Sequence, residues 1–137
     1  MASFEKINIP QKPPMVMVDR VMEIADTTTV TAFLIDKENV FVEDGYFREP
    51  GLIENMAQSA AAGFGARTGT GDKEPPVGFI GGIRNLKIHG FPLAGQEITT
   101  RVTVIHEIFD ATVVQGHVFL ENKLMAECEL KIFLIKQ

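Results

Sequence analysis

Hydrophobic residues recur at two different spacings along this chain. From Val77 to Ile135, apolar and polar residues alternate, which is typical of half-buried strands. Within residues 46–64, apolar side chains instead lie three and four positions apart, the spacing of one helical face. These helix positions are Leu52, Ile53, Met56, Ala57, Ala60, Ala61 and Phe64. The pattern therefore predicts one long helix followed by an antiparallel sheet.

The bounds of this helix are predicted from proline and glycine. Pro50 suits a helix start, because its φ angle is fixed and its nitrogen needs no hydrogen-bond partner there. Gly63 and Gly65 predict the end of the helix. Most of the apolar face between these residues is small, so we expect another element to pack very close to it.

The other segments are predicted to be strands and turns. Residues 20–25 and 28–35 are expected to form a hairpin about Asp26 and Thr27, and a glycine-rich and proline-rich loop is expected over residues 65–76. Further extended segments are predicted over 39–42, 77–89, 97–109, 112–120 and 124–135. In the strand over 97–109, one face is expected to carry Ile98, Val102, Val104 and Ile108.

This order of elements predicts an α+β fold in which one antiparallel sheet wraps one hydrophobic helix. A single domain over residues 1–137 accommodates the whole pattern. A lone sheet leaves strand edges unpaired. Pairing the 77–89 strands of two copies about a twofold axis would remove one edge, so we expect a homodimer with a continuous sheet.

Composition narrows the function classes. A net charge of −5 argues against nonspecific nucleic-acid binding, and no apolar run has the length of a signal peptide or a membrane span. The single cysteine, Cys128, excludes an intramolecular disulfide and is expected to be buried. No histidine pair has metal-ligand spacing with a carboxylate, so we expect neither a metal nor a cofactor. A cytoplasmic protein without membrane insertion is therefore expected.

Glu54 and Gln58 form a polar pair on a largely apolar helix and are the main candidates for a chemical role. They lie four residues apart on one flank of the predicted helix, near the end where unpaired N–H groups favour anions. Glu54 is either a solvated helix residue or a functional carboxylate. The strongly apolar helix around it favours the functional interpretation.

Several motifs resemble those of a known enzyme family. Residues 10–21, Pro-Gln-Lys-Pro-Pro-Met-Val-Met-Val-Asp-Arg-Val, resemble the opening Pro-His-Arg-x-Pro-Phe-Leu-Leu-Val-Asp-Arg-Val of the 3-hydroxyacyl-acyl-carrier-protein dehydratases. Residues 54–58 are similar to the Glu-x-x-Ala-Gln of that family, and residues 82–95 and 124–127 match its Gly-Ile strand and its Val-Ala-Glu. The strand start over 78–84 is most similar to the divergent dehydratase-like branch of aryl polyene and dialkylresorcinol pathways.

The resemblance implies a fold, a ligand and roles for particular residues. It implies a hotdog fold, assembled as a homodimeric double hotdog with acyl tunnels at the subunit interface. The implied ligand is an acyl thioester of an acyl carrier protein or of CoA, carried on 4′-phosphopantetheine. By position Glu54 is the acid/base, Gln58 supports it, and the N–H of Gly51 or Leu52 polarises the thioester carbonyl. The implied substrate-binding residues are Phe47, Pro50, Gly51, Leu52 and Gly82.

The chain departs from the family where the catalytic histidine should stand. The family carries Gly-His-Phe-Pro-Gly and a further loop before its helix, whereas this chain passes from Phe47 directly to Pro50. A missing acid/base partner is worth about 10²–10⁴ in rate. Tyr46, beside the deletion, and His89, at the end of the predicted interface strand, are candidate replacements. Otherwise Tyr46 lines the tunnel mouth and His89 is a surface residue.

Three functions remain open from the sequence. The leading hypothesis is a dehydratase-like enzyme of fatty-acid or polyene-type synthesis. The second is a catalytically silent subunit that binds acyl chains or a histidine-bearing partner dehydratase, and the third is an acyl thioesterase. Of the remaining histidines, His106 is expected to be half-buried and His117 exposed. A basic rim for an acidic carrier protein could be formed by Arg48, Arg67, Lys73, Arg84 and Lys87.

Overall fold

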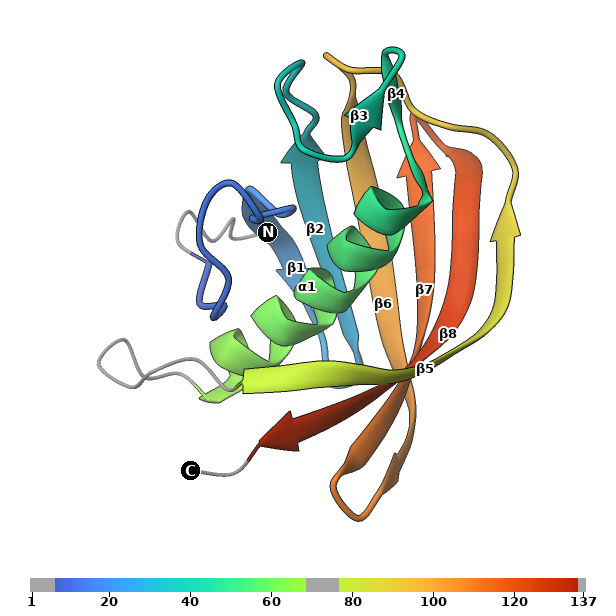
Figure 1. The fold of residues 1–137 in the computed structure, drawn as a ribbon. Helices are drawn as coiled ribbons and strands as arrows, with labels where there is room; N and C mark the ends of the chain where they lie inside the picture. Colours follow the sequence, from blue (N-terminus) through green and yellow to red (C-terminus); the bar gives the residue numbers. More distant parts are fainter. Residues whose placement is uncertain (1–6, 69–76, 136–137) are drawn as a thin grey trace.

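A six-stranded antiparallel sheet wraps around one helix in the computed structural model, which describes residues 7–68 and 77–135 (Figure 1). The strand order in the sheet is β1-β2-β6-β7-β8-β5. Its strands are β1 (Arg20–Ile24), β2 (Thr28–Leu34), β5 (Val77–Ile88), β6 (Glu97–Ile108), β7 (Ala111–Leu120) and β8 (Lys123–Ile135). Helix α1 spans Glu49–Thr68, and β3 (Val42–Glu43) pairs with β4 (Tyr46–Phe47) in a separate small sheet. This arrangement is a hotdog fold, so the fold predicted for the single chain is confirmed.

The concave face of the sheet and α1 enclose the hydrophobic core. Leu52 and Met56 of the helix are fully buried against strand residues such as Leu130. The helix also approaches β7 closely, because a Cβ atom at Gly116 would lie only 2.5 Å from Met56 Sδ. Within the described residues, α1 is not long and apolar enough to cross a membrane.

The predicted start of the helix is nearly right and its predicted end is wrong. The helix begins at Glu49, so Pro50 lies in its first turn, whereas Tyr46 and Phe47 belong to β4. At the other end the helix runs through Gly63 and Gly65 to Thr68. These glycines mark close packing, because a Cβ would collide with Thr29 Oγ1 at Gly63 and with the Asn8 carbonyl oxygen at Gly65. Of the predicted loop over 65–76, residues 69–76 lie outside the described residues.

The predicted apolar face of β6 fails at its C-terminal end. The register against β7 shifts between Val104 and His106, which marks a β-bulge. A bulge adds one residue to a strand and thereby reverses which side chains face the core. Ile108 is consequently 57% exposed, and His106 is exposed where half-burial was expected. His117, expected to be exposed, is half-buried with its ring stacked on that of Phe119.

Candidate active site

The start of α1 is fixed by backbone contacts with the small β3–β4 sheet. The Arg48 N–H donates to the Phe41 carbonyl at 3.0 Å, and the Leu52 N–H donates to the Arg48 carbonyl at 3.1 Å. The Leu52 amide is therefore engaged within the helix. Gly51 lies buried in the first turn, where amides have no carbonyl one turn earlier in the helix. A Cβ at Gly51 would lie 2.5 Å from the Phe47 ring, so glycine lets Phe47 pack against this turn.

The Gln58 side chain, in the middle of α1, makes three hydrogen bonds. It is fully buried, and its Oε1 accepts the Met17 N–H at 2.6 Å. Its Nε2 donates to the Met15 carbonyl at 2.7 Å and to Glu54 Oε2 at 2.8 Å. The two backbone groups fix the amide orientation, because a flipped amide would set N–H against N–H and oxygen against oxygen. Gln58 therefore presents a donor to Glu54.

Glu54 is half-buried on the flank of α1, four residues before Gln58. The Gln58 donor occupies Oε2, so a proton on the Glu54 carboxyl is directed to Oε1. An oriented carboxyl group beside a helix start can exchange a proton with a substrate while a first-turn amide polarises a carbonyl. The predicted pairing of Glu54 with Gln58 is thus present in the structure.

A buried polar network that the sequence analysis missed continues from this pair. Asn55 Nδ2 donates to the Met17 carbonyl at 2.7 Å, and Asn55 Oδ1 accepts from Thr100 Oγ1 at 2.5 Å. The Ser59 hydroxyl donates to the Asn55 carbonyl at 2.7 Å, and the Thr31 hydroxyl lies 2.7 Å from Ser59 Oγ. All four side chains are fully buried. The signal was a second stripe of polar residues at positions 55, 58 and 59 of an apolar helix.

Of the other predicted site residues, Pro50 shares α1 with Glu54, whereas Tyr46 and Gly82 lie on other elements. Tyr46 is 45% exposed in β4 and bridges to Leu93. Pro50 is exposed at the helix start. Gly82 pairs with Lys131 at the bulge of β5 and lines a groove on the outer face of the sheet. Gly51, Leu52, Glu54 and Gln58 thus lie along the first half of α1, with Phe47 packed on its first turn. Gly82 lies in β5 and lines the groove on the outer face of the sheet.

All three histidines of the chain lie toward the outer face of the sheet, away from α1. His117 alternates in β7 with the helix-facing Gly116 and Val118, and His106 lines the outer groove. His89 Nε2 lies 3.0 Å from Glu127 Oε2, and Glu127 alternates in β8 with the buried Ala126 and Cys128. The hydrogen bond from His89 holds the pKa of Glu127 below its ordinary value. Within one subunit, these positions separate the histidines from Glu54.

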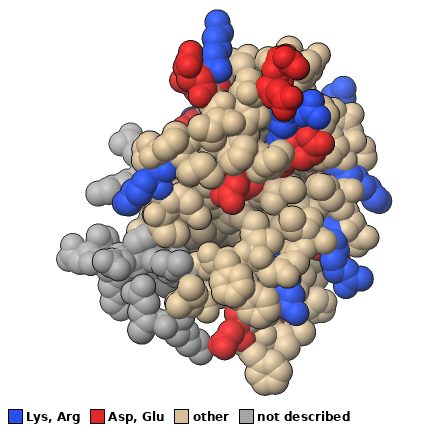
Figure 2. All heavy atoms as spheres, viewed as in Figure 1, with Lys and Arg blue, Asp and Glu red and all other residues tan. Residues whose placement is uncertain are grey.

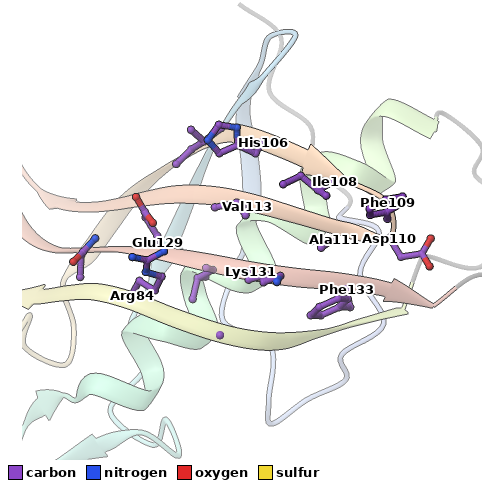
Figure 3. A pocket seen from close by; sticks show the side chains of 14 residues that line it. Arg84, His106, Ile108, Phe109, Asp110, Ala111, Val113, Glu129, Lys131 and Phe133 are labelled. Carbon is purple, nitrogen blue, oxygen red and sulfur yellow. The ribbon is translucent and has the colours of Figure 1, made fainter.

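The groove on the outer face has a volume of about 700 Å³ (Figure 3). Its walls combine the apolar side chains of Ile108 and Phe133 with the charged groups of Arg84, Glu129 and Lys131. Both signs of charge meet here, and Figure 2 likewise shows Lys and Arg interspersed with Asp and Glu over the face that it presents. The groove and Glu54 occupy opposite faces of the sheet.

The expected basic rim is divided by the fold. Arg48 lies at the start of α1, where it pairs with Glu49 at 3.1 Å and covers the Phe91 ring at 4.5 Å. Arg67 lies in the last turn, where its guanidinium donates to the carbonyls of Ala25 and Thr28. These two arginines therefore stand at opposite ends of the helix. Lys73 lies outside the described residues.

Comparison with known proteins identifies the family. The family model of the ApeP-like proteins, described as ApeP dehydratase, matches residues 5–137. The chain belongs to the ApeP-like dehydratase family. This confirms the resemblance to a divergent dehydratase-like branch that the motifs at residues 54–58 and 78–84 indicated.

Individual relatives of this ApeP-like chain agree with that assignment. The 3-hydroxyacyl-[acyl-carrier-protein] dehydratase FabZ of Campylobacter lari is 24% identical over 138 residues, which cover 93% of this chain and 92% of the relative. Among solved structures, the dehydratase heterocomplex ApeI:P from Xenorhabdus doucetiae matches with a TM-score of 0.83 at 15% identity, covering 95% of this chain and 90% of that chain.

A hypothetical thioesterase protein from Streptococcus pneumoniae, solved with coenzyme A, also shares the fold. It matches with a TM-score of 0.67 at 11% identity, and the match covers 85% of each chain. The fold around α1 is therefore common to proteins described as dehydratases and as thioesterases, and the side chains must decide between these activities.

Proposed function

We propose that this chain is a dehydratase subunit that eliminates water from a 3-hydroxyacyl thioester, with Glu54 as its acid/base group. The observation that carries the proposal is the oriented carboxyl group. Gln58, itself fixed by Met15 and Met17, donates to Glu54 Oε2 and leaves Oε1 to carry the proton. Membership in the ApeP-like dehydratase family supports the same reaction class.

The reaction assigns a separate task to each group. The C2–H and C3–O bonds break, a C2–C3 double bond forms, and water leaves. Glu54 donates its proton from Oε1 to the departing hydroxyl group. The Gly51 N–H, in the first turn of α1, donates to the thioester oxygen as negative charge develops there. Phe47 packs against this turn and Pro50 lies within it, so both would border the substrate.

The base that removes the C2 proton is proposed to come from a second, histidine-bearing subunit. The three histidines of this chain lie toward the outer face of the sheet, so they are badly placed to act together with Glu54 of the same subunit on one substrate. The solved neighbour ApeI:P is itself described as a dehydratase heterocomplex, which supports a mixed assembly. In a homodimer, His89 or Tyr46 of the second copy would have to serve instead.

The test is turnover of a medium-chain 3-hydroxyacyl carrier-protein thioester, followed by mass spectrometry for loss of water. The purified chain is assayed alone and mixed with a histidine-bearing dehydratase subunit. We expect turnover in the mixture and a loss of about 10²–10⁴ in the Glu54→Gln variant. Glu23→Gln, which changes an exposed carboxylate on β1, is the matched control and should retain the full rate. An unchanged rate in Glu54→Gln would contradict the proposal.

The same assay separates the alternative functions. A thioesterase would release free thiol and a hydroxy acid, with no enoyl product. A silent subunit that binds acyl chains or a partner dehydratase would show no turnover alone, and Glu54→Gln would leave the rate of the mixture unchanged. The histidines on the outer face of the sheet favour this second candidate over the thioesterase. Running the assay on the CoA and the carrier-protein thioesters identifies the carrier.

A cytoplasmic location, where both carriers occur, is part of the proposal.

A further inference from the structure

Asn55 hydrogen-bonds to the backbone of Met17, the residue whose N–H also fixes Gln58. The Met17 N–H donates to Gln58 Oε1, and the Met17 carbonyl accepts from Asn55 Nδ2. Both side chains come from consecutive turns of α1 and both are fully buried. Both backbone hydrogen-bonding groups of Met17, its N–H and its carbonyl, are therefore bonded to side chains of α1.

Met17 needs this support because it lies outside the sheet. Pairing between β1 and β2 begins at Arg20, three residues later, so the strand ladder does not hold Met17. The side chain of Met17 is fully buried in the core, which anchors the residue on one side. On the other side the hydrogen bonds to Gln58 and Asn55 set the direction of its N–H and C=O groups.

The orientation of the Asn55 amide follows from its partners. A carbonyl oxygen can only accept, so the amide group of Asn55 must turn Nδ2 toward Met17. Oδ1 then faces Thr100, whose hydroxyl group donates to it. Thr100 lies in β6, so Asn55 ties the Met15–Met17 segment to the central sheet.

We propose that Asn55 is a positioning residue for Glu54, acting through Met17 and Gln58. This inference rests on the proposed acid/base role of Glu54. The chain of contacts runs from Thr100 to Asn55, Met17 and Gln58, and it ends at Glu54 Oε2. When Asn55 is removed, Met17 can turn and Gln58 Oε1 loses its fixed partner. Only the Met15 carbonyl then holds the Gln58 amide, and the carboxyl group of Glu54 is less precisely oriented.

The deciding variant is Asn55→Leu, which keeps nearly the same shape and removes both hydrogen bonds. The matched control is Ser59→Ala. Ser59 lies one turn further along the same helix, is equally buried, and hydrogen-bonds to the Asn55 carbonyl and the Thr31 hydroxyl. Both changes remove buried hydrogen bonds, so both should lower the Tm. Only Asn55→Leu should disturb the path to Glu54.

Two measurements separate positioning from a merely structural role. In the active mixture, Asn55→Leu should lower kcat about tenfold to a hundredfold with little change in KM, because a displaced catalytic group costs rate rather than binding. In the isolated chain, NMR should show faster hydrogen exchange of the Met17 amide and shifted resonances of the Gln58 side-chain amide. Ser59→Ala should leave kcat and both NMR signals near their wild-type values.

The outcomes that overturn the inference are distinct from failure of the proposed function. If Asn55→Leu keeps its kcat, or if the Met17 amide exchanges as slowly as in the wild type, Asn55 does not position Glu54. If Asn55→Leu does not fold, Asn55→Ala is measured in the same way. If the wild-type mixture shows no turnover, the proposed dehydratase function fails, and the NMR measurements alone still decide whether Asn55 holds Met17 and Gln58.

Discussion

Fully buried polar residues on α1 have a purpose that apolar residues could not serve. Asn55, Gln58 and Ser59 are each completely shielded from solvent, and each is hydrogen-bonded. An unpaired buried polar group costs about 1–3 kcal/mol, so such a network must be complete to be tolerated. An apolar side chain in place of Gln58 could not donate a hydrogen bond to the carboxyl group of Glu54.

Cys128 provides a second prediction at the scale of one residue. Burial raises the pKa of its thiol from an ordinary value of 9.0 to about 11. Between these two pH values the unfolded chain loses the proton that the folded chain keeps, so the free energy of unfolding should fall as the pH rises from about 9 to about 11.

Chemical denaturation across this pH range checks the prediction on Cys128. The comparison is with Cys128→Ala, whose difference in stability from the wild type should shrink as the pH rises. A difference that stays constant with pH would contradict the raised pKa. Groups that titrate elsewhere in the chain affect both proteins equally, so they cancel in this comparison.

At the scale of the elements, glycine sets how closely α1 approaches its neighbours. Gly63 and Gly65 lie inside the helix, although glycine lowers helix stability by roughly 1 kcal/mol relative to alanine. These glycines allow close packing, since Thr29 and Asn8 occupy the space that a Cβ would need. The helix is long enough to cross the sheet because these glycines do not end it.

Gly65→Ala should therefore destabilise the protein by about 1–3 kcal/mol, although alanine favours helix formation. The added methyl group would meet the Asn8 carbonyl oxygen, a backbone atom that cannot move aside cheaply. Thermal denaturation measures the effect. Gly82→Ala is the comparison, since the nearest atom to its added Cβ would lie 3.8 Å away. A more stable Gly65→Ala variant would show that the contact with Asn8 is loose.

At the scale of the whole molecule, β5 forms one of the two edges of the six-stranded sheet. The strand ends the order β1-β2-β6-β7-β8-β5, and Figure 1 shows it curving past the helix at the margin of the sheet. It exposes the apolar side chains of Phe79, Ile83 and Leu86. An exposed apolar edge strand is a template for another strand. The proposed continuous sheet of two subunits, identical or different, would form here.

Placing a charge on this edge should prevent the pairing. Ile83→Asp puts a carboxylate at a position that is 44% exposed, so the single chain should still fold. Sedimentation analysis should then show a smaller assembly than the wild type, both for the chain alone and for the mixture with a histidine-bearing subunit. Leu34→Asp, at an exposed position at the end of β2, is the control and should leave the assembly intact. An unchanged assembly in Ile83→Asp would place the interface elsewhere.

Local patterns along the chain were enough to predict the α+β class, the helix and the main strands. Alternation and helical spacing arise from the geometry of single elements, so they are visible in the sequence. The helix end at Gly63 and Gly65 and the burial of His106 were predicted wrongly. In both cases the deciding contact lies with another element: Asn8 meets Gly65, and the pairing with β7 shifts in register at His106.

In the candidate site, too, some features follow from local sequence patterns and others from tertiary contacts. The sequence by itself determined that Glu54 and Gln58 share one helix flank, because their spacing is a property of the helix alone. Only the tertiary structure decided that Met15 and Met17 fix Gln58, that Asn55 and Thr100 support Met17, and that the histidines lie on the outer face of the sheet. Those relations depend on segments that meet through folding, and no local pattern encodes which backbone group a buried amide will find.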